Sequence, residues 1–346
     1  MTMPGKRMQW YRLPLRNVDT VVFVHGFKGH FRKSWGAFPR LLDEDPDLPT
    51  LDILLWGYRS KLFGKVHDIK TEGKHLTSHL QMLIQEGLNI FLVGHSMGGI
   101  VLLKGLVDRM TDNHAQLHPC KSVAWITLFA SPLRGTLVAV SAKRMLAKFS
   151  WRKGSDHKQL KDLVPEGELI ALMEQVKDRI YQPAAIDAGR RLIPIRVVVA
   201  TNDSVVDTPD KDLDFAEFND LPPVQLDESH RSINEPKSHN DVRYWAFTRD
   251  LQERLTDEFV LLCQRATDAS LFEQEREFAV EQIISRYSKI IDDRVQEIAR
   301  GRAKLLSKAN ESFMGYFLHG GAQLEKPAFD VANRARALAK RENAFR

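Results

Sequence analysis

The chain has 346 residues, of which 43% are hydrophobic and 27% are charged, as is typical of a soluble globular protein. Its formal net charge of +5 includes no concentrated basic block, so the composition argues against a nucleic-acid partner. Two distant cysteines, Cys120 and Cys263, do not predict a disulfide framework, and no uncharged apolar run approaches the ~20 residues that span a bilayer. The basic start of the chain lacks an apolar leader, so we expect a cytoplasmic protein.

Short apolar runs alternate with helical patterns over the first 130 residues. Four runs that end in turn residues predict buried strands: TVVFVHGF (20–27), LDILLWGY (51–58), NIFLVGHS (89–96) and VAWITLFASP (123–132). A helical pattern at 68–87 precedes the third run, and an apolar helix at 97–110 follows it. This alternation predicts an α/β fold with a mostly parallel sheet and right-handed crossovers.

The strand rhythm breaks at about residues 136–191, where we expect a helical cap inserted between two strands. It returns with IPIRVVVATND (193–203) and PPVQLDESH (222–230) before a helix at 241–255. Residues 256–346 are charged and helical, with an apolar stripe formed by Ile283, Tyr287, Ile291, Val295 and Ile298. We therefore expect one α/β domain over 1–255 and a helical extension over 256–346.

Ser96 is the candidate nucleophile, because it stands in the sequence Gly-His-Ser-Met-Gly between a strand and a helix. A strand–turn–helix setting is what a nucleophile elbow requires. Side chains at Gly94 and Gly98 would clash in such a turn, where the strand and helix backbones come close together. The start of the helix adds oriented N–H groups that favour a developing oxyanion.

A serine nucleophile needs a histidine base and a carboxylate, which in elbow-type hydrolases follow in the order acid, then histidine. Asp203 is the favoured acid, because it comes first after the strand at 193–200, and Asp207 is the alternative. His230 is the favoured base, because it directly follows the last strand-like run, and His239 is the alternative.

Two backbone N–H groups are expected to form an oxyanion hole. One belongs to Met97, the residue after the nucleophile, and the other to the loop after the first long strand. In that loop Gly26 would let the following backbone turn inward, so Phe27 is the expected second donor. We expect His25 to be a structural residue that packs this loop.

These motifs resemble the α/β-hydrolase superfamily: VHGF after an early strand, GHSMGG at the elbow, FASPLRGT after the next strand and NDSVV at the acid turn. Within it the chain is most similar to a lipase-like branch that includes serine-active-site-containing proteins and GPI inositol-deacylase-like esterases. In that branch the catalytic histidine often opens a segment similar to SHRSINEPKSHND, which favours His230 over His239. The resemblance covers about residues 15–255 and implies an α/β-hydrolase fold.

The implied reaction is the hydrolysis of a carboxylic ester, through an acyl-enzyme and without a metal or an organic cofactor. Apolar and basic residues alternate in the expected cap at 137–153, which favours a lipid or phospholipid acyl ester and peripheral contact with an anionic membrane. A cap helix packed over the site explains the same pattern equally well. Two alternatives stay open: an acyltransferase that uses the same triad, and a binding or signalling protein that pairs with a second copy or a partner through residues 256–346.

Overall fold

The computed structural model describes most of the α/β region and the helices that follow it. The residues described are 8–15, 18–27, 29–58, 68–83, 88–110, 122–133, 171–172, 174–176, 180, 193–206, 222–268 and 270–299. The chain divides into two compact units. The first comprises Met1–Pro14, Thr20–Leu41 and Asp52–Phe247, and the second Leu15–Asp19, Leu42–Leu51 and Thr248–Arg346. The predicted domain limit between residues 255 and 256 stays a prediction.

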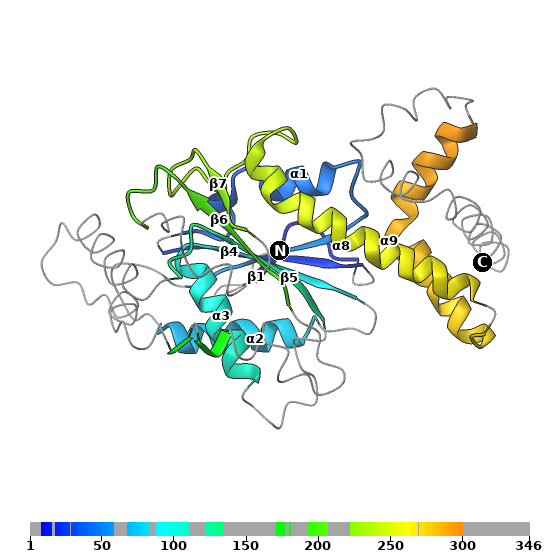
Figure 1. Cartoon of the computed structure of the whole chain (residues 1–346), viewed down its shortest axis with the longest axis horizontal. Helices are drawn as coiled ribbons and strands as arrows, with labels where there is room; N and C mark the ends of the chain where they lie inside the picture. Colours follow the sequence, from blue (N-terminus) through cyan, green and yellow to red (C-terminus); the bar gives the residue numbers. More distant parts are fainter. Residues whose placement is uncertain are drawn as a thin grey trace, which may run out of the picture. The chain divides into compact units, whose positions relative to one another are not determined.

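A seven-stranded sheet forms the centre of the first unit (Figure 1). Its strands are β1 (Met8–Trp10), β2 (Thr20–Val24), β3 (Asp52–Trp56), β4 (Ile90–His95), β5 (Val123–Phe129), β6 (Ile195–Ala200) and β7 (Val224–Leu226). They lie in the order β1-β3-β2-β4-β5-β6-β7, and each neighbouring pair is parallel except β1 with β3. The predicted mostly parallel α/β sheet is therefore confirmed, with the antiparallel edge strand β1 as an addition.

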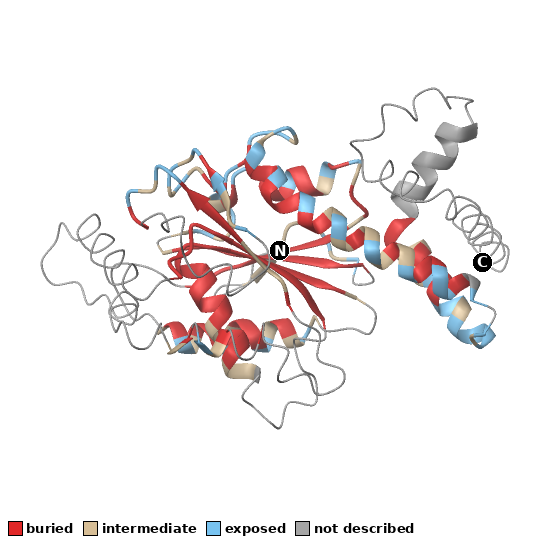
Figure 2. Cartoon of the chain, in the orientation of Figure 1, coloured by how far each residue is buried: buried red, intermediate tan, exposed pale blue. Residues whose placement is uncertain are grey.

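The four strands β2 to β5 are buried along their whole length (Figure 2). Such burial explains why their sequences are continuous apolar runs, since a strand covered on both faces has no solvent side that would call for polar residues. Because parallel strands align their carboxyl ends, the residues that follow β2, β4, β5 and β6 gather at one edge of the sheet.

Helices cover both faces of this sheet (Figure 1). On one face lie α2 (Ile69–Gln81), whose first turn is capped by Asp68, and α3 (Met97–Met110). The other face holds the 3₁₀ helix η1 (Lys33–Trp35), the start of α1 (Phe38–Glu44) and the start of α8 (Val242–Thr267). An aromatic cluster fills that side: Phe23, Trp35, Phe38, Phe129 and Phe247.

Most of the predicted cap lies outside the described residues, and so does the mixed apolar and basic stretch at 137–153. A short helical piece is described at 171–172 and 174–176. Its buried residues Leu172 and Val176, together with Ile180, belong to the apolar core beside α2 and α3. The second half of the insertion thus contributes to the core of the first unit.

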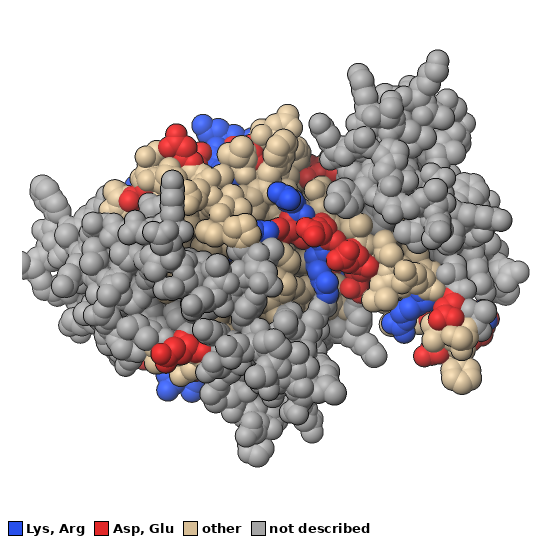
Figure 3. Space-filling model, in the orientation of Figure 1, with Lys and Arg blue, Asp and Glu red and all other residues tan. Residues whose placement is uncertain are grey.

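The second unit contains most of α8 and the helix α9 (Glu273–Ala299). Charged residues line the exposed side of α8 at four-residue spacing, at Arg249, Glu253 and Asp257 (Figure 3). Tyr287 of α9 donates its hydroxyl to the Leu255 carbonyl at 3.0 Å, so the start of the predicted apolar stripe packs against α8. The stripe's later side chains lie outside the described residues, and a partner for them stays a prediction.

A buried ion pair links α9 to the segment at 15–19 within the same unit. Arg286 donates to the Asp19 carboxylate at 2.5 and 3.2 Å, and both side chains are at most 2% exposed. Of the helices described, none combines the length and the apolar character needed to cross a bilayer.

Candidate active site

Ser96 stands in a strained turn between β4 and α3. Its φ of 53° is positive, and among the described residues Ala130 is the other non-glycine with a positive φ. Gly98 makes the turn possible, because a Cβ there would lie 2.3 Å from the Val24 carbonyl oxygen and 2.4 Å from that of His25. The expected elbow geometry, with glycine forced by close backbone contact, is thus present.

The structure brings together Ser96, His230 and Asp203, from three different segments of the chain. His230 Nε2 lies 2.9 Å from Ser96 Oγ, and His230 Nδ1 lies 2.7 Å from Asp203 Oδ2. With Nδ1 protonated, the ring donates to the carboxylate and its Nε2 lone pair accepts the serine hydroxyl. This set has the connectivity needed to take a proton from Ser96.

The turn after β6 fixes the orientation of the Asp203 carboxylate. Its Oδ1 accepts the backbone N–H groups of Val205 and Val206 at 2.7 and 2.8 Å, which leaves Oδ2 to face His230. The Asp203 side chain is 2% exposed and that of His230 is 13% exposed. The carboxylate is therefore held in one rotamer, away from water, before any substrate arrives.

The structure describes the alternative base, His239, but not the alternative acid, Asp207. His239 binds the Leu41 carbonyl through Nε2 at 2.9 Å and packs edge-on against Tyr244, so its ring serves the α1 side of the sheet rather than Ser96. Asp207, the alternative acid, lies outside the described residues.

A second histidine, His95, contacts the backbone of His230, the candidate base, and the sequence analysis did not identify it. Its Nε2 lies 2.8 Å from the His230 carbonyl oxygen, and the two rings are 5.1 Å apart. Burial lowers the pKa of His95 to about 3, so the ring is neutral and its proton resides on Nε2. The available signal was a histidine at the end of a buried strand, where a polar side chain needs a hydrogen-bond partner.

The expected oxyanion loop lies directly against Ser96, the candidate nucleophile. A Cβ on Gly26 would lie 2.8 Å from Ser96 Cβ, so the loop approaches Ser96 as closely as backbone can. Met97 is the first residue of α3, and the first amides of a helix have no partner within the helix. Phe27 follows in the loop and is half-buried against the core.

His25 shapes this loop, as its expected structural role requires. Its Nδ1 donates to the Gly26 carbonyl at 2.8 Å, and its Nε2 accepts the Tyr58 N–H at 3.3 Å. The ring also stacks on that of Tyr58, with centroids 4.7 Å apart. Burial lowers the pKa of His25 to about 4, which keeps the ring neutral and this pattern of donors intact.

In the described part of the chain, no group of three or more His, Cys, Asp or Glu side chains is arranged so that it could hold a metal ion. The site's polar groups are instead arranged around the hydroxyl of Ser96.

Comparison with known proteins gives a family match for the first half of the chain. Residues 16–179 match a family described as "Putative serine esterase (DUF676)". No curated protein sequence matches the chain.

Solved structures similar to this chain are distant in sequence. Bacillus licheniformis lipase BlEst2 has 17% identity and a TM-score of 0.42, over 71% of this chain and 97% of that one. The monoacylglycerol lipase of Paleococcus ferrophilus has 15% identity and a TM-score of 0.45, over 71% and 98%. Est1E from Butyrivibrio proteoclasticus has 12% identity and a TM-score of 0.46, over 72% and 93%.

Proposed function

We propose that the chain cleaves a carboxylic ester through Ser96, His230 and Asp203. The mostly parallel α/β sheet and the match of residues 16–179 to a family described as a putative serine esterase support this proposal. One observation carries the proposal: the unbroken path from Asp203 Oδ2 through both nitrogens of His230 to Ser96 Oγ, with steps of 2.7 and 2.9 Å. A serine hydroxyl is a poor nucleophile at neutral pH, and this path supplies the base that it lacks.

The reaction runs in two steps. Ser96 Oγ attacks the ester carbonyl while His230 Nε2 takes its proton, and the imidazolium then gives that proton to the leaving alcohol. Water enters next, loses a proton to His230 and releases the acid from the serine. Asp203 stays ionised and holds the ring through Nδ1 in both steps.

The oxyanion of each tetrahedral intermediate is held by the N–H groups of Met97 and Phe27. The position of Met97 at the start of α3 and the passage of the Gly26 loop over Ser96 support this assignment. Each such donor lowers the barrier by roughly 3 kcal/mol.

The ester we propose is a lipid or phospholipid acyl ester, presented at an anionic membrane surface. Support comes from the mixed apolar and basic sequence at 137–153. Cleavage of phospholipid in anionic vesicles, with binding to those vesicles, is the expected result. A protein that ignores vesicles and cleaves short soluble esters alone would overturn the lipid assignment and leave the esterase chemistry standing.

Labelling with a fluorophosphonate probe tests the nucleophile. We expect the wild type to be labelled and Ser96→Ala to be inert. The matched control is Ser122→Ala, which removes another buried serine, just before β5 at the opposite edge of the sheet. Labelling of Ser96→Ala at the wild-type rate would refute the proposal.

A further inference from the structure

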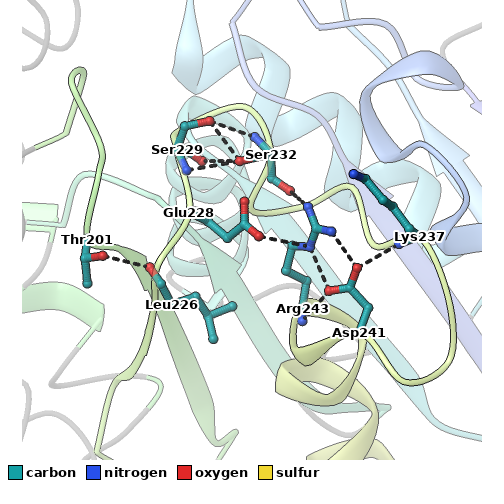
Figure 4. Close-up of polar contacts among 8 residues, drawn as sticks. All are labelled: Thr201, Leu226, Glu228, Ser229, Ser232, Lys237, Asp241 and Arg243. Atoms are coloured by element: carbon teal, nitrogen blue, oxygen red, sulfur yellow. Dashed lines mark hydrogen bonds and ion pairs between the residues drawn. The ribbon is translucent and has the colours of Figure 1, made fainter.

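The loop that carries His230 is closed on itself. It runs from the end of β7 to residue 233, with His230 at its centre. Ser229 and Ser232 bind each other on either side of the histidine, with their hydroxyls 2.8 Å apart and the Ser229 N–H donating to Ser232 Oγ at 3.0 Å (Figure 4). This closure fixes the shape of the loop, but it does not hold the loop against the rest of the first unit.

Thr201 and Asn202, after β6, bind the start of this loop at residues 226–228. Arg243, near the start of α8, makes a second external connection, which reaches both sides of His230 (Figure 4). Its Nη1 donates to the Ser232 carbonyl at 3.0 Å, two residues after His230. Its Nε also lies 3.4 Å from Glu228 Oε1, two residues before His230. One guanidinium thus contacts the loop on both sides of the histidine.

Asp241 holds the guanidinium in place. Its Oδ1 accepts Arg243 Nε at 2.7 Å and its Oδ2 accepts Nη2 at 2.5 Å, so the pair is bidentate. The carboxylate also accepts the backbone N–H groups of Lys237 and Arg243, which anchor it to its own turn. The Arg243 side chain is 9% exposed, so water competes little for these bonds.

The pair is charged over the whole working range of pH. Hydrogen bonds from Arg243 lower the pKa of Asp241 to about 2, and the same carboxylate raises the pKa of Arg243. The contacts between Arg243 and Asp241 therefore do not depend on pH between the pKa of Asp241 and that of Arg243.

We propose that Arg243, oriented by Asp241, is a positioning residue that fixes the His230 loop from outside and so sets the distance between His230 Nε2 and Ser96 Oγ. The inference rests on the proposed function of His230. His95 holds the inner side of the same loop through the His230 carbonyl, so the histidine backbone is fixed from two directions. The hydrogen bonds and ion pairs of Arg243 are with Asp241, Ser232 and Glu228, and none of them is with Ser96 or the His230 ring.

Loss of the contact between Arg243 and the His230 loop is expected to slow proton transfer from Ser96 to His230 while leaving the affinity for the probe unchanged. A misplacement of about 1 Å in a reacting geometry can cost about 100-fold in rate. We expect Arg243→Met to lower kinact for fluorophosphonate labelling by roughly 10- to 100-fold, with KI within about a factor of two of wild type. The kinact of Arg243→Lys should lie between those of Arg243→Met and the wild type, since one ammonium cannot reproduce the planar guanidinium that binds both Asp241 and the loop.

The control is Arg196→Met. Arg196 Nη1 also donates to a main-chain carbonyl, that of Pro222 at 2.9 Å, two residues before β7, and no contact that the structure gives for Arg196 or Pro222 reaches Ser96, His230 or Asp203. We expect wild-type kinact for this variant. Asp241→Asn is the second probe, because it keeps the shape of the pair while weakening its hold, and should lower kinact in the same direction as Arg243→Met.

Circular dichroism and thermal melts establish which variants are folded, and kinact is measured on the folded protein. If folded Arg243→Met reacts at the wild-type kinact, the proposal is overturned. Where Arg243→Met does not fold, the proposal is overturned if folded Arg243→Lys and folded Asp241→Asn both react at the wild-type kinact. It is also overturned if Arg196→Met loses as much rate as Arg243→Met. A wild type that resists labelling would instead refute the proposed nucleophile, which separates the two failures.

Discussion

Replacing Asp203 with asparagine changes one atom in the proposed triad, and the structure dictates how the amide must sit. Two backbone N–H groups, from Val205 and Val206, donate to Oδ1 at 2.7 and 2.8 Å. Those donors require an acceptor, so the oxygen of the new amide takes this place and its NH₂ group faces His230 Nδ1.

The amide then imposes the wrong tautomer on His230. An NH₂ donor at Nδ1 requires a lone pair there, which moves the imidazole proton to Nε2. In that form Nε2 donates to Ser96 Oγ across the 2.9 Å contact and can no longer accept its proton. The same substitution in the serine-protease triad costs about 10⁴-fold in kcat, or about 5 kcal/mol of barrier.

The assay compares Asp203→Asn with Asp207→Asn, the alternative acid. We expect kinact for the fluorophosphonate to fall by about 10⁴-fold in Asp203→Asn and to stay near wild type in Asp207→Asn. Because both backbone contacts of the turn survive, the melting temperature should stay close to that of the wild type. A folded Asp203→Asn that keeps a tenth or more of the wild-type rate would refute this reasoning, and a loss confined to Asp207→Asn would reassign the acid.

Three further predictions concern stability. His25 and His95 have folded pKa values of about 4 and about 3, below the ordinary 6.5, so the unfolded chain binds more protons as pH falls from 6.5 towards 4. The free energy of unfolding should therefore decrease over that window by up to about 1.4 kcal/mol per pH unit for each histidine; urea titrations at pH 6.5, 5.5 and 4.5 check this, and a flat profile would contradict it. Gly98→Ala should prevent a native elbow, because its Cβ would meet two carbonyls at the end of β2 at 2.3 and 2.4 Å, and a soluble, labelled variant with the wild-type melting temperature would count against this. Arg286→Met removes the guanidinium from buried Asp19 and should cost about 3–5 kcal/mol in a denaturant melt, with a loss under about 1 kcal/mol as the contrary result.

Strand assignment from sequence worked where burial on both faces produces an unbroken apolar run, as in β2 and β4. It failed for β1, whose three residues are half-buried and pair antiparallel with β3 at the edge of the sheet. A strand this short carries too few residues for a periodic signal, and its pairing is decided by a partner more than 40 residues away.

In the candidate site, too, residues marked by a local sequence pattern were predicted, and residues defined by long-range contacts were not. Ser96, Asp203 and His230 could be selected because each comes at the end of a strand or the start of a turn, positions that the local pattern reveals. The contact between His95 and the His230 carbonyl joins residues 135 positions apart, and the main-chain acceptor leaves no mark in the sequence. Arg243 could not be distinguished from the other charged residues of its predicted helix. Its guanidinium binds a main-chain carbonyl and Asp241, and neither contact belongs to a recognisable sequence motif.

The Arg286–Asp19 pair has a consequence for how the chain is made. Its partners lie 267 positions apart, one just before β2 and the other in α9. At about 5–20 residues per second, ribosomal synthesis separates their appearance by roughly 13–53 s. Throughout that interval the Asp19 carboxylate has no Arg286 to pair with, so the second unit can reach its final packing only after residue 286 has been translated.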